Sequence, residues 1–545
     1  MMSFCNRPIQ RLLRFSVLFA FGSALAGSGV LAQTGSPLTP SEARTARAFE
    51  AAKKLGAPEL YAFLKPMPKG ADLHMHLSGA VYAETFIAEA VKQGLCVDPK
   101  ALTFAPPVTG KDAPCGPGNL PASSALKDQR LYDALIDAFS MRSFVPSSGV
   151  SGHDQFFSTF DHFRGLDSSH AGEWLDEVVR RAAAQNEQYL EAMQTPTFTH
   201  AADLGYKLGW PKGAEKTVTP QQLARLRDEL LASGVRDEVG VDSKELADAE
   251  SARRAMEGCE GAQPNPVQIQ GMEYDPCTIQ THWLYQVLRG FPPQQVFAQT
   301  LLGFEVASAD PHVVGINFVM PEDGRVSMQD YHLQMQMLDY LHSVYPKVRL
   351  SLHAGEIAPG MVTPDGLRFH IREAIDLGHA ERIGHGMDVL YEDHPSALLK
   401  EMADKHVMVE INLTSNDVIL GLTRTDHPLA AYRAAHVPVA LSTDDEGVSR
   451  IDLTHEYVKG AEEQGLTYVD LKQMARTSLE HAFLAGESLW AAPDSFTRRK
   501  AACAAPITST SNPTSACAVL LKSSERAAEQ WELERRFALF EASIH

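Results

Sequence analysis

This sequence of 545 residues lacks any excess of basic residues. Its formal charge is −19, and no long run of charges of one sign interrupts it. A surface this acidic repels a phosphate backbone, which argues against nucleic acid as a ligand. Beyond the first 32 residues, no stretch approaches the about 18–20 apolar residues that a membrane span requires. The composition therefore favours a globular chain that binds small molecules and has no membrane span after that point.

Cysteine is scarce, with seven in the whole chain, and none has the C-x-x-C spacing of a redox or zinc-thiolate site. Beyond Cys5, six remain, in three local pairs whose members are 14 to 19 positions apart. We expect sequential disulfide pairing in an oxidising compartment. Free thiols in a reducing compartment are the alternative. The six are Cys96, Cys115, Cys259, Cys277, Cys503 and Cys517.

The first 32 residues have the composition of a secretory signal peptide. Arg7, Arg11 and Arg14 precede the apolar segment 15–25, and Val30-Leu31-Ala32 has the small-x-small pattern that signal peptidase cleaves. The segment contains three Arg and no acidic residue, so the remainder carries a formal charge of −22. We expect an exported protein, periplasmic or secreted. The alternative is an uncleaved membrane anchor.

Short apolar strands alternate with helical stretches, most regularly from residue 278 to residue 490. Such alternation is typical of parallel β/α units. We interpret the segment Trp283–Leu288 as a helix and residues 65–490 as a (β/α)8 barrel of the TIM type. The predicted strands cover residues 66–77, 188–193, 313–318, 348–352, 382–384, 407–411 and 437–441.

The rest of the chain interrupts or flanks this barrel. We predict insertions at about 94–130 and 200–277, of which the first begins as a loop rich in proline and glycine. Residues 33–64 precede the barrel as an extension with a helix, which we expect Ser41 to cap. Residues 491–545 follow it as a helical extension with one loop bounded by cysteines.

Four short motifs follow predicted strands and carry side chains that bind metals or protons. His74 and His76 are two positions apart, so the alternation of a strand places them on the same side. The segments His353–Glu356, Gly384–Gly386 and Ser442–Asp445 follow apolar strands in the same way. Each has a structural explanation on its own: a hydrogen-bonded core histidine, a turn glutamate or a capping pair of aspartates. Together they lie where barrel active sites form, at the C-terminal ends of strands.

The residue types in these motifs suit a catalytic metal site. Three His and one Asp form a coherent ligand set that leaves one coordination position for water. Three other polar side chains then remain for proton transfer. The proposed ligands are His74, His76, His353 and Asp444, and the proton-transfer residues are Glu356, His385 and Asp445.

These segments resemble the adenosine/AMP deaminase superfamily of metal-dependent hydrolases, in order and in spacing, over roughly residues 65–460. The predicted signal peptide and the long insertions are most similar to secreted, growth-factor-related adenosine deaminases and to bacterial exported ones. The matching segments are Met67–Ala80, His353–Glu356, Arg382–Gly386, Glu410–Asn416 and Ser442–Asp445.

The resemblance implies a hydrolase that converts adenosine or 2′-deoxyadenosine to inosine or 2′-deoxyinosine and ammonia. It assigns one Zn²⁺ per chain to His74, His76, His353 and Asp444. His385 would orient the attacking water, Glu356 would protonate purine N1, and Asp445 would hydrogen-bond N7. The expected partner is a small purine nucleoside rather than a nucleic acid, and an oligomer is possible.

Three positions depart from the pattern of the resembled family. Ser78 stands where an Asp helps to bind the ribose, Met320 replaces a glycine whose N–H contacts the ring, and Glu446 stands where Pro is common. We expect Ser78 and Met320 to contact the substrate. These departures leave open an adenine or N6-substituted purine deaminase on the same scaffold. A more distant alternative is a binding or signalling protein without catalysis.

Overall fold

The computed structural model describes residues 38–108, 115–147, 149–166, 168–260, 267–269 and 272–545. The predicted signal peptide and the first residues of the extension that follows it lie outside these ranges. The segment Thr39–His545 forms one compact unit. Among the described residues, no helix combines the length and the apolar character needed to cross a membrane.

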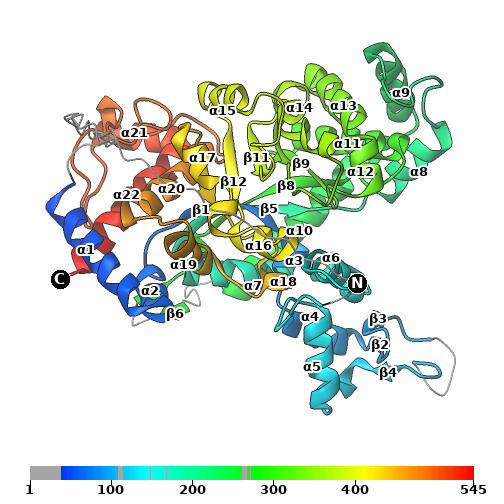
Figure 1. Cartoon of the computed structure of the whole chain (residues 1–545), viewed down its shortest axis with the longest axis horizontal. Helices are drawn as coiled ribbons and strands as arrows, with labels where there is room; N and C mark the ends of the chain where they lie inside the picture. The colour runs from blue at the N-terminus through cyan, green and yellow to red at the C-terminus, as the bar shows by residue number, and fades with distance from the viewer. Residues whose placement is uncertain (1–37, 109–114, 148, 167, 261–266, 270–271) are drawn as a thin grey trace, which may run out of the picture. The chain divides into compact units, whose positions relative to one another are not determined.

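Eight parallel strands form one sheet at the centre of this unit, and the connecting helices surround it (Figure 1). The strand order follows the chain. The first and last strands meet where Met75 bridges Asp444 in parallel, and the Asp444 N–H donates to the carbonyl oxygen of His74 at 2.8 Å. This contact closes the sheet and confirms the predicted (β/α)8 barrel. The strands are β1 Gly70–His76, β5 Glu187–Gln194, β8 Gln280–Leu288, β9 Val313–Val319, β10 Arg349–Ala354, β11 Arg382–His385, β12 Met408–Ile411 and β13 Val439–Leu441.

The barrel strands are buried along most of their length because side chains cover both faces of a parallel sheet. Leu352, Ile383 and Val409, on three neighbouring strands, are all fully buried. The covering helices present apolar side chains at intervals of three and four residues, as in Trp174 and Val178. These helices are α7 Ala171–Ala184, α11 Pro293–Ala309, α13 Tyr331–Val344, α14 His370–Asp376, α15 Pro395–Asp404, α17 Leu429–Ala434 and α20 Tyr468–His481.

The interpretation of Trp283–Leu288 as a helix is wrong. This segment belongs to β8, which pairs in parallel with β5 on one side and β9 on the other. Trp283, Leu284 and Tyr285 are consecutive buried residues, so the segment shows no two-residue alternation. A short apolar run buried on both faces has the same sequence pattern as a buried helical segment.

Both insertions carry regular structure. The first contains a three-stranded antiparallel sheet in place of the predicted loop, with strands β2 Cys96–Asp98, β3 Thr103–Ala105 and β4 Leu120–Pro121. The helices α5 Gln129–Ala138 and α6 Gly152–Phe163 follow this sheet. The second contains α8 Thr199–Leu208, α9 Pro220–Ala232, α10 Val239–Glu257 and the hairpin of β6 Val267–Ile269 with β7 Met272–Tyr274.

The three predicted disulfides are confirmed. They join Cys96 to Cys115, Cys259 to Cys277 and Cys503 to Cys517, which is sequential pairing. The last one closes the loop between the barrel and the C-terminal helices α21 Ser515–Ser523 and α22 Glu525–Ser543.

The N-terminal helix α1 Pro40–Leu55 begins two residues earlier than predicted. Thr39, and not Ser41, is its N-cap. The Thr39 hydroxyl accepts the N–H of Glu42 at 3.2 Å, and the Glu42 carboxylate accepts the Thr39 N–H at 2.9 Å. This reciprocal capping box satisfies two N–H groups at the helix start, which a cap at Ser41 would leave unpaired.

Lys69 anchors the start of β1 to the helices beneath the barrel. Its side chain is fully buried, and Nζ lies within 3.1 Å of four backbone carbonyl oxygens. These oxygens belong to Leu64, Lys65, Met67 and Gln185, at the ends of α2 Ala57–Leu64 and α7. Helix-end carbonyls need such donors when they are buried.

We therefore expect Lys69→Met to lower the free energy of unfolding by about 3 kcal/mol, because it leaves several buried carbonyl oxygens without a donor. Chemical denaturation measures this change. Lys54→Met, at an exposed position of α1, is the control and should change stability by less than about 0.5 kcal/mol. Equal stability of the two variants would show that Lys69 does not hold β1.

Candidate active site

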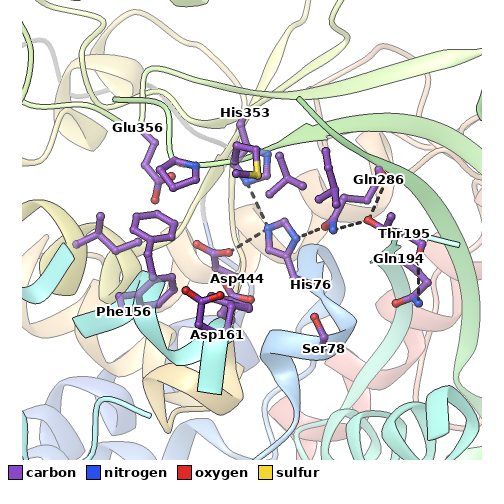
Figure 2. Close-up of a pocket in the computed structure, with 18 of the residues that line it drawn as sticks. His76, Ser78, Phe156, Asp161, Gln194, Thr195, Gln286, His353, Glu356 and Asp444 are labelled. Atoms are coloured by element: carbon purple, nitrogen blue, oxygen red, sulfur yellow. Dashed lines mark hydrogen bonds and ion pairs between the residues drawn. The ribbon is translucent and has the colours of Figure 1, made fainter. Parts of the chain in front are cut away.

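The four predicted metal ligands meet at the C-terminal end of the barrel, as Figure 2 shows for three of them. Nε2 of His76 lies 3.3 Å from Oδ1 of Asp444 and 3.3 Å from Nε2 of His353. Nε2 of His74 lies 3.7 Å from the same carboxylate oxygen. Ligands bound at 2.0–2.1 Å to one tetrahedral ion are about 3.3–3.4 Å apart. The separations therefore fit a single small cation.

Hydrogen bonds at Nδ1 orient the three rings. In each ring Nδ1 faces an oxygen acceptor, which places the proton on Nδ1 and the lone pair on Nε2. Nε2 of His74 is buried and makes no hydrogen bond within the described residues. A divalent cation would satisfy it. The acceptors are Glu410 at 2.6 Å for His74, Gln286 at 2.5 Å for His76 and Asn317 at 3.1 Å for His353.

Glu410 is itself held by a buried network of charges. Its carboxylate accepts hydrogen bonds from the Ser351 hydroxyl and from Nε of Arg382, both at 2.7 Å. The Arg382 guanidinium also donates to Glu191 at 2.6 Å. Both carboxylates and the guanidinium are fully buried, so each charge depends on the others for compensation. This network fixes the acceptor that orients His74.

The backbone at the site is in the left-handed region at two residues that are not glycine. Asp444 has φ +60° and His385 has φ +67°. Such conformations cost free energy and persist only where the surrounding structure enforces them. Gly384, next to His385, lies so close to His74 that a Cβ there would be 2.5 Å from its Cε1. The first glycine of the Gly-His-Gly motif therefore makes room for a metal-facing ring.

Two buried carboxyl groups lie beside the metal-facing cluster. Burial raises the pKa of Glu356 well above its usual range, and the nearby charges of Asp444 and Glu322 raise it further. Burial also raises the pKa of Asp445, with a further contribution from Asp444. Both side chains are therefore suited to carry a proton near neutral pH.

Glu322 positions the backbone of the Glu356 loop. Its carboxylate accepts the N–H groups of Gly355 at 2.8 Å and Glu356 at 3.1 Å. The guanidinium of Arg289 lies 3.6 Å from its other oxygen. Glu356 thus extends from a loop whose backbone is held by Glu322, in the segment that follows β9.

His385 lies beside the cluster and is fully buried. Burial lowers its pKa to about 3, so the ring is neutral. Its Nε2 is 3.7 Å from Oδ2 of Asp444, and its Nδ1 is 3.6 Å from Oε1 of Glu356. The ring therefore connects the metal-facing cluster to the carboxyl that can carry a proton.

A cavity of about 480 Å³ opens onto this cluster. Ser78, Met320, Glu356 and Asp445 all line it, as the sequence predicts for substrate contacts. Figure 2 shows Ser78, Gln194 and Thr195 on the side of His76 away from Glu356. Among the described residues that line the cavity there is no lysine or arginine. Its apolar wall consists of Phe156, Phe157, Phe160, Trp174, Leu288 and Ile419.

The sequence reasoning missed most of this wall. Phe156 and Phe160 are four residues apart on α6, which lies after the predicted first insertion at about 94–130. That spacing indicates one apolar helix face, but it does not tell a cavity wall from a core contact. It also missed Gln286, because the surrounding strand β8 was interpreted as a helix.

The departures from the family pattern have local structural partners. Glu446 accepts a hydrogen bond from Arg181 at 2.7 Å, and the same guanidinium donates to the Ala80 carbonyl at 2.6 Å. This pair ties the segment after Asp445 to the segment that carries Ser78. The Met320 side chain packs on Gly290, where a Cβ would lie 2.9 Å from its terminal methyl group.

Comparisons with known proteins point to one family. A family model described as adenosine deaminase matches residues 270–491. The adenosine deaminase of Clostridium perfringens (strain 13 / Type A) is 34% identical over 140 residues, which are 26% of this chain and 39% of that protein. The adenosine deaminase of Escherichia coli O1:K1 / APEC is 38% identical over 141 residues, 25% of this chain and 38% of that one. The alignments thus span about two fifths of the relatives' own length.

A solved structure of an Arabidopsis N6-mAMP deaminase is similar over a longer stretch. It covers 77% of this chain and 94% of that chain, at 20% sequence identity and a TM-score of 0.48. The family model spans the segments around His353, His385 and Asp444. Over this part of its length the chain is similar to adenosine deaminases.

Proposed function

We propose that this protein is a zinc-dependent deaminase of 6-aminopurine nucleosides, with adenosine and 2′-deoxyadenosine as its substrates. The observation that carries the proposal is the convergence of three Nε2 atoms and one carboxylate, each imidazole oriented by an acceptor at Nδ1. Imidazole and carboxylate ligands suit Zn²⁺. The family match over residues 270–491 supports the same chemistry.

In this proposal the metal ligands are His74, His76, His353 and Asp444, and one ion is held per chain. When bound, the zinc ion would supply Lewis acidity and lower the pKa of coordinated water toward about 7. The remaining steps belong to side chains of the protein. Water adds to C6 of the purine, ammonia leaves, and the product is inosine or 2′-deoxyinosine.

Glu356 and Asp445 act on the two ring nitrogens. N1 and N7 of adenine are both acceptors, so each needs a donor. The raised pKa values of the two carboxyl groups keep protons available for them. Glu356 transfers its proton to N1, which makes C6 more electrophilic. Asp445 donates to N7 and orients the ring, and His385 orients the attacking water.

The cavity lining favours a nucleoside over a nucleotide. No lysine or arginine lies among the described residues that line it. A phosphate would therefore find no cationic side chain to pair with there. Ser78 and Gln194 instead offer uncharged polar groups to sugar hydroxyls. Nε2 of Gln194 is 3.4 Å from the Thr195 carbonyl oxygen, near the limit of a hydrogen bond, so it can turn to a ligand.

We also propose that the protein acts outside the cytoplasm. The signal-like first 32 residues and the three disulfides support export to an oxidising compartment.

Removal of the metal should abolish deamination. We expect the purified protein to contain one zinc per chain by elemental analysis, chelation to stop adenosine turnover, and added Zn²⁺ to restore it. His353→Ala should lose both metal and activity. His332→Ala, at an exposed histidine away from the cavity, should keep both. Full activity in metal-free protein would contradict the proposal.

Substitution of the proton-transfer carboxyl should leave the metal in place. We expect Glu356→Gln to lower kcat by about 10²- to 10⁴-fold, because Gln cannot donate a proton to N1, with one zinc retained. The absorbance change of the 6-aminopurine measures turnover. Glu373→Gln, on α14 outside the cavity, is the control. A Glu356→Gln protein with the wild-type rate would rule out the assignment.

A substrate panel tests the preference for a nucleoside over a nucleotide. We expect kcat/KM for AMP to be at least about 100-fold below that for adenosine, because the described lining offers a phosphate no lysine or arginine to pair with. Adenine should also be poorer than adenosine, since it lacks the sugar that Ser78 and Gln194 would bind. Comparable values for AMP and adenosine would contradict the preference for a nucleoside. A preference for adenine would assign the protein as an adenine deaminase instead.

A further inference from the structure

His385 differs from the three metal-directed imidazoles in what its Nδ1 contacts. It faces two side-chain amides, Nδ2 of Asn416 at 3.0 Å and Nδ2 of Asn412 at 3.4 Å. The Glu356 carboxyl also faces it, at 3.6 Å, beyond hydrogen-bond distance. Nε2 of His385 is buried and makes no hydrogen bond among the described residues. The position of the ring proton therefore decides whether Nε2 meets the cluster as a donor or as an acceptor.

A hydrogen-bond chain that begins at the backbone determines this position. The N–H of Leu429 lies 3.1 Å from Nδ1 of His427, and a backbone N–H can only donate. Nδ1 of His427 is thus the acceptor. Burial lowers the pKa of His427 to about 3, so the ring is neutral and carries its proton on Nε2. That nitrogen lies 3.2 Å from Oδ1 of Asn416 and donates to it.

The orientation of Asn416 passes this constraint on to His385. Because Oδ1 accepts from His427, Nδ2 is the atom that points at Nδ1 of His385, and it donates. The reverse orientation of the amide would place its N–H against the N–H of His427, which is repulsive. Nδ1 of His385 therefore accepts, and the neutral ring carries its proton on Nε2, 3.7 Å from Oδ2 of Asp444.

We propose that His427 and Asn416 are positioning residues that fix the Nε2-protonated tautomer of His385. The proposal rests on the proposed function, in which the Nε2–H of His385 orients the water that adds to C6. The opposite tautomer would present a lone pair to the cluster. Ligand atoms of His74, His353 and His385 already lie within 4.8 Å of one another, so that tautomer would make His385 a competing metal ligand. The hydrogen bonds from Leu429 through His427 and Asn416 keep Nε2 of His385 a donor.

Two substitutions at His427 separate this role from simple packing. His427→Leu fills the buried space but removes the donor to Asn416, and His427→Gln keeps an N–H near the position of Nε2. We expect kcat for adenosine to fall about 10- to 100-fold in His427→Leu, somewhat less than the cost of deleting a donor outright. KM and the zinc content should stay within about twofold. His427→Gln should restore most of the lost rate.

His370→Leu is the matched control. His370 is a buried histidine whose ring nitrogens make no hydrogen bonds among the described residues, and it does not line the cavity. We expect this variant to keep the wild-type kcat. Equal rates in His427→Leu and wild type, or equal defects in His427→Leu and His427→Gln, would overturn the proposal.

Nitrogen NMR of the full, zinc-loaded chain with ¹⁵N-labelled histidine rings reads the tautomer directly. We expect a protonated Nε2 and an unprotonated Nδ1 for His385, identified by signals that are missing in His385→Gln, and a mixture in His427→Leu. A proton on Nδ1 in the wild type would contradict the proposal. If His385→Gln kept the wild-type rate, the role of His385 in the proposed function would fail. The NMR spectrum would still show whether His427 and Asn416 fix the tautomer of His385.

Discussion

Three imidazole rings direct Nε2 at one point because a hydrogen bond at Nδ1 fixes the orientation of each ring. The acceptors come from three different strands: Gln286 from β8, Asn317 from β9 and Glu410 from β12. The metal-facing geometry therefore depends on the register of strands on both sides of the ligands. Closure of the barrel by the contact between His74 and Asp444 brings the first and last strands into the same arrangement. The site is a consequence of the closed sheet and could not form on an isolated β/α unit.

Four buried carboxyl groups at the site differ in how far the groups beside them offset the effect of burial. Burial raises the pKa of Glu410, but Arg382 and His74 more than offset this and lower it. The surrounding imidazoles likewise lower the pKa of Asp444, although burial alone would raise it. For Glu356 the charge of Arg289 offsets only part of the effect of burial, and for Asp445 nothing offsets it, so the pKa values of both carboxyl groups rise. One pocket thus keeps some carboxylates ionised as ligands and orienting acceptors, and others protonated as donors to the purine ring.

The sequence predicted the barrel and the cluster for a physical reason. Parallel strands buried on both faces are recognisable as short apolar runs, and the polar residues that end them stand out against those runs. His353, His385 and Asp444 are all of this kind. The Cys spacings identified the disulfides because a loop of fewer than twenty residues closes readily between neighbours.

The features that escaped prediction depend on contacts between distant segments. β8 was interpreted as a helix because burial on both faces removes the alternation that marks a strand. Arg181 and Glu446 are 265 positions apart, and nothing in either local sequence indicates the pair. The chain from Leu429 through His427 to His385 also appears only in three dimensions. Sequence patterns therefore located the groups that bind and react, whereas the groups that orient them required the structure.

The central claim is that one metal ion is held by three imidazole nitrogens and one carboxylate. X-ray absorption at the zinc edge of the purified full chain tests it most directly. We expect a first coordination shell of nitrogen and oxygen only, at about 2.0–2.2 Å, with the outer-shell scattering of imidazole rings. A sulfur shell at about 2.3 Å, or a shell without imidazole scattering, would contradict it.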